Sequence, residues 1–282
     1  MTKQLLLIDG NSIVFRAFFA MHNQMDKFTN KDGLHTAAIY GFKLMLDHVL
    51  QNFKPDAALV AFDAGKVTFR TKMYDDYKGG RNKTPNELTE QIPYVRELIK
   101  DSGLHSYELA NYEADDIIGT LAKQADDAGY KTLIVTGDRD LTQLASENTT
   151  VAVTHKGVTD TEHYTPAHVE EKLGITPRQI IDMKALMGDS SDNYPGVTKI
   201  GEKTAIKLVK QFGSVEELYD HIDDLKKSKM KEHLIEDEEV ARQCKTLATI
   251  LQDAPIKIGL DDLQYQGPQT DDLIKFYKEM GF

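Results

Sequence analysis

The chain has 282 residues, 40% of them hydrophobic and 8% aromatic, and its 45 acidic and 34 basic side chains give a formal net charge of −11. This length holds one large domain or two smaller ones, and the composition excludes a disordered or fibrous protein. The single cysteine, Cys244, excludes an internal disulfide, the first apolar run is too short for a signal peptide, and no run reaches the roughly 18 residues of a membrane span.

We therefore expect a cytoplasmic protein that makes no membrane contact, and we interpret Cys244 as a helix-packing residue rather than a nucleophile. The net negative charge argues by itself against nucleic-acid binding, whose usual mark is a basic domain. The basic residues are concentrated, however. Residues 66–83 carry six basic against two acidic side chains, and residues 199–210 carry four against one.

Two short apolar runs in the first part of the chain each meet an aspartate. They are 5–8 with Asp9 and 57–62 with Asp63. Both runs are expected to be buried strands, and the stretch between them is expected to hold a helix at 12–19, with Ser12 as its N-cap, and a helix at 34–53. One aspartate after a strand is usually a turn former or a helix cap, so its repetition is what favours a shared site.

Residues 64–93 interleave basic and aromatic side chains and contain few aliphatic ones. Near the end of this segment, Thr84 is placed to cap a short helix and Pro85 to occupy its first position. We expect an exposed, mobile arm. It is either an ordinary solvated loop or a segment that grips phosphates with its cations and stacks bases on its rings, and the residues alone leave both interpretations open.

A helix is expected at 92–101 and a strand at 104–109, followed by a helix that starts with Glu113, Asp115 and Asp116. Acidic residues favour the positive end of a helix dipole, which is their ordinary explanation here. The spacing places Glu113 and Asp116 on one face and turns Asp115 away from them. Three such charges would raise one another's pKa unless a cation lay among them, so they are candidate metal ligands.

Residues 133–136 are the expected central strand, because four apolar or β-branched residues in a row suit a strand covered on both faces. This strand ends at Gly137 and delivers Asp138 and Asp140. In an open α/β sheet the carboxyl ends of the strands line the ligand crevice, so these two acids are expected at the site. The next expected elements are a short helix at 141–145 and a strand at 149–154.

From residue 166 the pattern becomes helical. Helices are expected at 166–173, 177–187, up to 212, 214–225 and 230–251, and the tail at 261–282 is expected to be acidic and then helical. The acidic run 236–239 is interpreted as a solvated face. The apolar end of the tail suggests either docking against the body of the protein or the approach to another domain.

A polar loop at 188–196 carries Asp189 and Asp192, and a glycine-bounded hairpin follows it. Two helices joined by such a hairpin form a helix-hairpin-helix, which holds a DNA phosphate with its amides and a helix N-terminus without reading bases. Its cations are Lys199, Lys203 and Lys207.

Nine carboxylates are thus expected at the polar ends of these elements. They are Asp9, Asp63, Glu113, Asp115, Asp116, Asp138, Asp140, Asp189 and Asp192. No histidine or cysteine accompanies them at ligand spacing, which disfavours zinc, whereas oxygen ligands alone favour Mg²⁺ or Mn²⁺. Nine acids suit two ions, and a pair about 4 Å apart serves in-line phosphodiester displacement.

The ordered motifs of this chain resemble those of the 5′-nuclease (flap endonuclease) family, most closely the branch that forms the N-terminal 5′→3′ exonuclease domain of bacterial DNA polymerase I. The motifs are 8–12, 62–64, 69–70, 77–81, 112–116, 136–140 and 188–193. The resemblance covers essentially the whole chain. It implies an α/β fold with a mostly parallel, PIN-like sheet and flanking helices, followed by a helical helix-hairpin-helix region.

The resemblance also implies a structure-specific 5′→3′ exonuclease and 5′-flap endonuclease for primer removal and repair, a monomer whose partner is DNA with a 5′ flap, a nick or a 5′ end. The implied division is a nuclease core at 1–172 with an arch at 64–93, a DNA-binding region at 173–260 with its hairpin at 186–212, and a tail at 261–282. The motifs 265–267 and 276–282 resemble the join to a covalent polymerase domain.

By the family pattern, a first ion is held by Asp63, Glu113 and Asp115, with Asp9 and Asp116 near it, partly through water. A second ion is held by Asp138, Asp140 and Asp189, with Asp192 close by and Asp115 as a bridge. The residues expected to act in catalysis are Asp63, Asp115 and Asp138, together with Lys78 and Arg81 at the scissile phosphate.

The family pattern assigns further DNA contacts to Arg70, Tyr77, Lys78, Arg81, Arg16 and the hairpin lysines Lys199, Lys203 and Lys207. Phe15 lies where the family often stacks an aromatic ring near the cleaved nucleotide, with core packing as the alternative. Lys199 replaces a glycine usual in the family, which bears on the hairpin geometry and on a K⁺ site there. The rival functions are a PIN-type ribonuclease and a non-catalytic module that binds DNA junctions.

Overall fold

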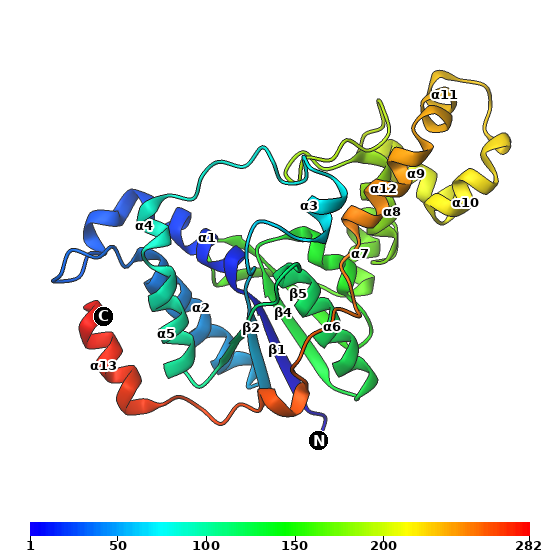
Figure 1. Ribbon diagram of the computed structural model, residues 1–282. Coiled ribbons are helices and arrows are strands. Elements are labelled where there is room, and N and C mark those ends of the chain that lie inside the picture. Colours follow the sequence, from blue (N-terminus) through cyan, green and yellow to red (C-terminus); the bar gives the residue numbers. More distant parts are fainter.

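The computed structural model describes residues 1–282 and is built on one six-stranded sheet with the strand order β3-β2-β1-β4-β5-β6 (Figure 1). The strands are β1 Gln4–Asp9, β2 Ala57–Ala61, β3 His105–Tyr107, β4 Lys131–Thr136, β5 Thr149–Lys156 and β6 Asp160–Tyr164. All neighbouring pairs are parallel except β5 and β6, which are antiparallel. The predicted α/β class with a mostly parallel sheet is confirmed.

The two central strands are β1 and β4, which are buried on both faces and therefore read as continuous apolar runs. In the register of the sheet, Ile8 pairs with Val60 on one side and with Val135 on the other. Three strands consequently end at the same edge of the sheet. The edge strand β6 was not predicted, because its sequence of mainly polar residues lacks an apolar run.

Helices cover both faces of the sheet. One face is covered by α1 Gly10–Ala20, α2 Ala37–Phe53, α5 Ile92–Asp101 and α13 Thr270–Met280, and the other by α6 Ala114–Asp127 and by helices of the second half of the chain. Two short 3-10 helices, η1 His22–Lys27 and η2 Arg139–Leu144, follow α1 and β4. The prediction that Ser12 caps α1 is wrong, since the helix begins at Gly10 and the Ser12 hydroxyl accepts the amide of Gly137.

The arm at 64–93 forms an arch that crosses above α1 in Figure 1, between α3 Phe69–Met73 and α4 Asn86–Thr89. It is less exposed than its sequence suggested, because Arg70, Tyr77 and Leu88 are each at least 94% buried. The cap prediction also fails, since Pro85 stands at the N-cap of α4 and no side chain caps that helix.

The second half of the chain supplies a layer of short helices. They are α7 Pro166–Leu173, α8 Gln179–Met187, α9 Glu202–Phe212, α10 Val215–Asp220, η3 Ile222–Asp224, α11 Lys229–Glu236 and α12 Glu238–Ala248. Their apolar side chains join one face of the sheet in a single core of 41 buried residues, which includes Cys244. The helical region therefore has no core separate from that of the sheet.

The expected helix at 230–251 is broken at Asp237, between α11 and α12. The run 236–239 is exposed or partly exposed, in agreement with its interpretation as a solvated face, but Asp237 also has protein partners. Asp237 Oδ2 accepts hydrogen bonds from the amide (2.8 Å) and the hydroxyl (2.7 Å) of Thr198, and so fastens the hairpin to the start of α12.

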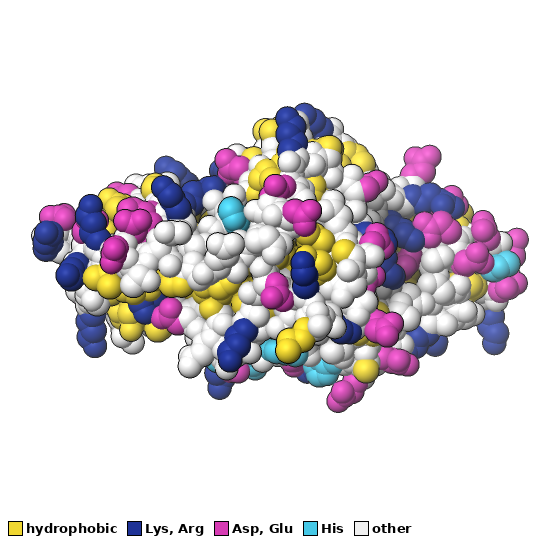
Figure 2. Space-filling model, turned by 90° about the horizontal axis from the view of Figure 1, so that it is seen from below, with side chains coloured by type: hydrophobic (Ala, Val, Ile, Leu, Met, Phe, Trp, Pro, Cys, Tyr) yellow, Lys and Arg dark blue, Asp and Glu magenta, His cyan; other side chains and the backbone are white.

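The tail passes through η4 Leu260–Leu263 and ends in α13, which docks beside α5 by burying Phe276 and Met280. The ring of Phe282 lies 5.2 Å from that of Tyr40 in α2. None of the helices combines the length and the apolar character that crossing a membrane would require. Seen from the side on which β1 begins, acidic and basic side chains are interspersed without a large area of one sign (Figure 2).

Candidate metal centre

Carboxylates gather at the sheet edge where the parallel strands end. Asp9 is the last residue of β1, Asp63 follows β2 by two residues, and Asp138 follows β4 by two residues. The charges of Asp63 and Asp138 both act on Asp9, and those of Asp9 and Asp138 act on Asp115 at the start of α6. The topology therefore brings together acids that are more than 120 residues apart in the chain.

Backbone and hydroxyl donors orient these acids. Asp9 Oδ2 accepts the hydroxyl of Thr136 at 2.8 Å, and Asp63 Oδ1 accepts the amide of Ala114 at 2.7 Å. Asp138 Oδ1 caps η2 by accepting the amide of Asp140 at 2.8 Å. Each of these bonds engages one carboxylate oxygen and fixes the direction of the group, so the cluster is held in place before any ion binds.

The second half of the cluster comes from η2 and from the loop after α8. Carboxylate oxygens of Asp140, Asp189 and Asp192 lie within 4.8 Å of one another, a spacing at which one cation contacts all three. The loop turns at Gly188, whose φ of 73° and ψ of −177° suit glycine alone. Asp189 Oδ1 then accepts the amides of Ser191 (2.8 Å) and Asp192 (3.1 Å), which closes the loop.

Three cations border the cluster. Lys78 pairs with Glu113, and Arg81 Nη2 lies 2.7 Å from Asp192 Oδ1. Lys184 Nζ, on α8, lies 3.1 Å from Asp189 Oδ2 and 3.4 Å from Asp140 Oδ1. Sequence reasoning missed Lys184, and its one signal was a lysine inside an otherwise largely apolar helical run.

Arg70 does not face the solvent and has no donor left for DNA. Its Nε donates to the carbonyl of Leu247, its Nη1 to Glu113 and Asp116, and its Nη2 to Asp116 and the carbonyl of Thr249. All five N–H groups of the guanidinium are used. The expected DNA contact of Arg70 is therefore replaced by a buried link between the arch, α6 and the end of α12.

The same link accounts for Asp116, which is fully buried. Its Oδ2 accepts from Arg70 and from the amide of Glu113, and its Oδ1 accepts from Arg70 and from the amide of Leu251. With four donors on two oxygens, both oxygens of Asp116 are engaged by the protein, and Asp116 lies beside Glu113 through their shared partner Arg70. Glu113 and Asp116 do share a face, as predicted, and Asp115 faces the other acids.

The charge of the cluster is only partly compensated. Nine carboxylates meet four cations, Arg70, Lys78, Arg81 and Lys184, which leaves five negative charges when all are ionised. Burial raises the pKa of Asp9 to about 7, helped by Asp63 and Asp138 and opposed by the Thr136 hydroxyl. Burial likewise raises the pKa of Asp140 to about 8, with Asp138 adding to it and Lys184 opposing.

Glu113 behaves differently from its neighbours. Burial opposes its ionisation, but Lys78 and Arg70 outweigh burial and hold the pKa of Glu113 below its ordinary value. The pKa of Asp115, by contrast, is raised well above the ordinary value by burial and by the charges of Asp9 and Asp138. Glu113, which two cations contact, is thus easily ionised, whereas Asp9, Asp115 and Asp140 resist ionisation because burial and neighbouring carboxylates outweigh any cation near them. An all-oxygen set of this charge fits hard divalent ions.

The other residues expected at DNA lie in different settings. Phe15 is 38% exposed on α1, whereas Tyr77 is buried with its hydroxyl donating to Glu113. Arg16 Nη2 donates to the carbonyls of Thr154 (3.1 Å) and His155 (2.7 Å), at the end of β5. The arch residues Lys78 and Arg81 border the acids.

The three lysines expected in the hairpin are all exposed. Lys203 and Lys207 are exposed on the first turns of α9, and Lys199 is exposed in the turn before them. The φ of Lys199 is +62°, in the left-handed region that favours glycine, which is the residue expected at this position.

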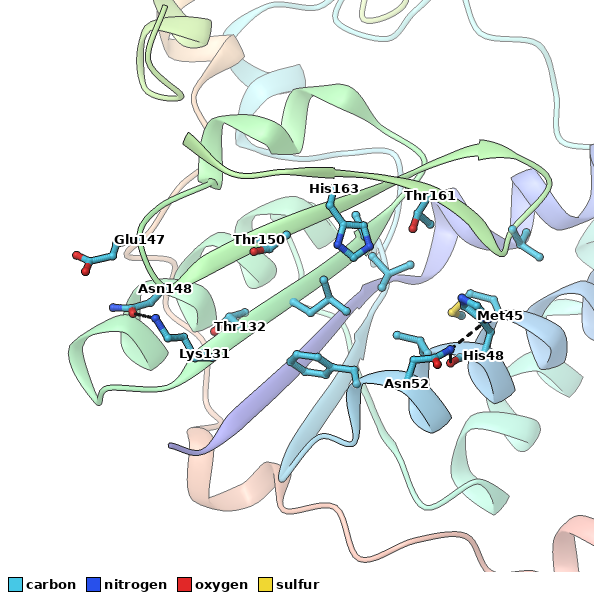
Figure 3. Close-up of a pocket in the computed structure, with 16 residues that line it drawn as sticks. Met45, His48, Asn52, Lys131, Thr132, Glu147, Asn148, Thr150, Thr161 and His163 are labelled. Atoms are coloured by element: carbon cyan, nitrogen blue, oxygen red, sulfur yellow. Dashed lines mark hydrogen bonds between the residues drawn. The ribbon is translucent and has the colours of Figure 1, made fainter. Parts of the chain in front are cut away.

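A groove of about 470 Å³ lies apart from the acids, over the face of β4, β5 and β6 beside α2 (Figure 3). Its rim includes His48 and Asn52 of α2, Lys131 of β4 and His163 of β6. None of the nine carboxylates lines it. This groove is therefore separate from the acid cluster at the edge where the strands end.

Two family models together cover most of the chain. The model of the 5′-3′ exonuclease N-terminal resolvase-like domain matches residues 4–174, and that of the 5′-3′ exonuclease C-terminal SAM fold matches residues 175–271. The DNA polymerase I of Streptococcus pneumoniae R6 is 60% identical over 280 residues, which are 99% of this chain and 32% of that protein. The chain thus spans about a third of the length of this relative.

Solved structures with the same fold are more distant in sequence. The 5′-exonuclease of bacteriophage T5 with bound zinc ions is 22% identical with a TM-score of 0.76, over 99% of this chain and 98% of that one. The bacteriophage T5 flap endonuclease in complex with DNA and metal ions is also 22% identical, with a TM-score of 0.74 over 99% and 100% of the two chains.

Proposed function

Because this chain belongs to the 5′-3′ exonuclease family, we propose that it hydrolyses DNA phosphodiester bonds as a metal-dependent 5′→3′ exonuclease and 5′-flap endonuclease, and that it serves primer removal and repair. The observation that supports this most is the convergence of acids from three strand ends and one loop, with Asp140, Asp189 and Asp192 close enough to share a cation. Family membership and this donor set point to the same chemistry.

We assign two Mg²⁺ or Mn²⁺ ions to the cluster. Asp63, Glu113 and Asp115 would hold one, with Asp9 beside it, and Asp138, Asp140, Asp189 and Asp192 would hold the other. Bound there, the ions would supply a water of lowered pKa and a positive charge for the leaving oxygen. Asp116 acts indirectly in this scheme, because it fixes Arg70, which holds Glu113.

We assign the grip on DNA to two surfaces that flank the acids. Lys78 and Arg81 extend from the arch to the cluster, where a phosphate would take the place of their carboxylate partners. The hairpin, held by Asp237, presents Lys199, Lys203 and Lys207 to the backbone of a duplex. Its backbone carbonyls would also bind a K⁺ ion.

We further propose the division into a nuclease core at 1–172 with the arch at 64–93, a DNA-binding region at 173–260 with its hairpin at 186–212, and a tail at 261–282. A covalent polymerase domain is the proposed neighbour, since the chain matches 32% of a DNA polymerase I. The active form is proposed to be a monomer.

The test compares a 5′-flap DNA with its RNA counterpart, in Mg²⁺ and in chelator, for the parent chain and for Asp138→Asn. We expect cleavage of the DNA near the branch, which the chelator abolishes, and a loss of cleavage in Asp138→Asn with binding largely retained. Preferential cleavage of the RNA would support a PIN-type ribonuclease instead. Tight DNA binding without cleavage in Mg²⁺ or Mn²⁺ would replace the enzyme with a junction-binding module.

A further inference from the structure

Lys184 is the one cation of the cluster that comes from neither the arch nor the hairpin. It lies on α8, whose neighbouring residues Met183, Ala185 and Leu186 are all buried in the core. The backbone of α8 is thus fixed, and the lysine reaches the acids from a packed helix rather than from a surface loop. Its side chain is 22% exposed.

The ammonium of Lys184 lies against two of the three acids that could share an ion. Its Nζ lies 3.1 Å from Asp189 and 3.4 Å from Asp140, and these two acids belong to the trio whose oxygens lie within 4.8 Å of one another. The side chains of Asp189 and Asp140 are only 8% and 22% exposed, so solvent screens this contact weakly. Arg81, which pairs with Asp192, is 51% exposed and is a weaker competitor.

We propose that Lys184 is the built-in counter-ion of the Asp140–Asp189–Asp192 half of the cluster, and that a divalent ion binds this half by displacing its ammonium. Lys184 therefore lowers the affinity of one of the two ion sites while it stabilises the metal-free protein. This inference rests on the proposed function, because it takes the acid cluster as the site of two ions.

The test is a Mn²⁺ titration of the metal-free protein, followed by electron paramagnetic resonance of free Mn²⁺, for the parent and for Lys184→Met. Methionine keeps the length of the stem and removes the charge. Because the lysine is partly exposed, we expect the affinity at one of the two sites to rise about tenfold and the other to stay within about twofold. The matched control is Lys123→Met, the same change at an exposed position of α6, and it should leave both affinities unchanged.

A second variant and a second measurement keep the inference testable if Lys184→Met folds poorly without metal. Lys184→Arg retains the charge and should restore the parent affinities. In the parent protein labelled with ¹³C at lysine Cε, the Lys184 resonance should shift with one of the two Mg²⁺ binding steps and not with the other. The resonance is assigned by its absence in Lys184→Arg.

Two failures are distinguishable. Two bound ions with equal affinities in Lys184→Met and the parent, or a Lys184 resonance that ignores Mg²⁺, would overturn the role of Lys184 and leave the proposed function intact. A parent protein that binds no Mn²⁺ would overturn both.

Discussion

Arg70→Met is the change that most directly tests the buried link between the arch and the rest of the site. Arg70 is 2% exposed and its five donors meet Glu113, Asp116 and two carbonyls at the end of α12. Methionine fills most of the space but leaves two carboxylates and two carbonyls without their donor. Glu113 keeps Lys78 and Tyr77 as partners, whereas Asp116 keeps only backbone amides.

Removal of one partner from a buried ion pair costs about 3–5 kcal/mol, because the remaining charge is buried without compensation. The side chains of Arg70, Glu113 and Asp116 are 3%, 7% and 0% exposed, so no discount for solvent screening applies. For a chain of this size each kcal/mol lowers Tm by about 2–4 °C, which predicts a fall of about 10 °C. The matched control is Arg242→Met, whose pair with Glu238 is 43% and 46% exposed and is worth less than about 1 kcal/mol.

The measurement is urea unfolding in chelator at several pH values. The folded-state pKa of Glu113 is depressed in the parent, so its pairing contributes stability above the ordinary value of 4.5 and loses it as the pH falls through the folded-state pKa. The deficit of Arg70→Met should therefore be largest near neutral pH and shrink in acid, where the stranded carboxyl takes up a proton. A variant as stable as the parent at neutral pH, but with weaker DNA binding, would refute the buried link and restore Arg70 as a DNA contact.

Two further predictions concern the acids and the hairpin. With the pKa of Asp9 at about 7 and that of Asp140 at about 8, both groups take up protons as the pH falls. Mn²⁺ affinity should therefore drop about tenfold or more between pH 8.5 and pH 6, and Mn²⁺ binding should release protons. Calorimetry in two buffers of different ionisation enthalpy measures the affinity and the proton release, and an affinity independent of pH would contradict the prediction. Lys199→Gly should raise the free energy of unfolding by up to about 1 kcal/mol, because glycine adopts a φ of +62° without strain. It should also reduce the slope of DNA affinity against salt concentration by about one charge. A loss of stability in urea unfolding would show that the backbone of Lys199 is not strained.

The sheet was predictable because a strand that is buried on both faces has a continuous run of apolar residues in the sequence. The runs at 5–8, 57–62 and 133–136 are apolar or β-branched at every position. The aspartates that follow them were expected at one site because parallel strands end at the same edge of a sheet. The strand β6 could not be predicted in this way, since an edge strand needs no apolar run. Element ends depended on contacts between distant residues, as with Ser12, whose hydroxyl binds Gly137 instead of capping its own helix.

The partners of the charged residues were harder to predict than their positions. Arg70 belongs to a basic, aromatic segment that is typical of a surface, and only the approach of α6 and α12 places it in the core. Lys184 is one of several polar positions on a largely apolar helix, and its partners come from η2, which is distant in the chain, and from the loop that follows α8. Sequence thus identified the acids, whereas it could not tell which cations face solvent and which face the acids.

The pairing of these cations joins the arch to the acid cluster. The backbone amide of Lys78 donates to the carbonyl of Asp192 at 2.8 Å, and Asn193 Nδ2 donates to the carbonyl of Asp76 at 2.8 Å. Through Lys78 and Arg81 the arch also neutralises Glu113 and Asp192. An ion bound at these acids would weaken both ion pairs and free two cations of the arch. The DNA phosphate proposed above would need those same cations, so ion binding and DNA binding by the arch should reinforce each other, as linkage requires.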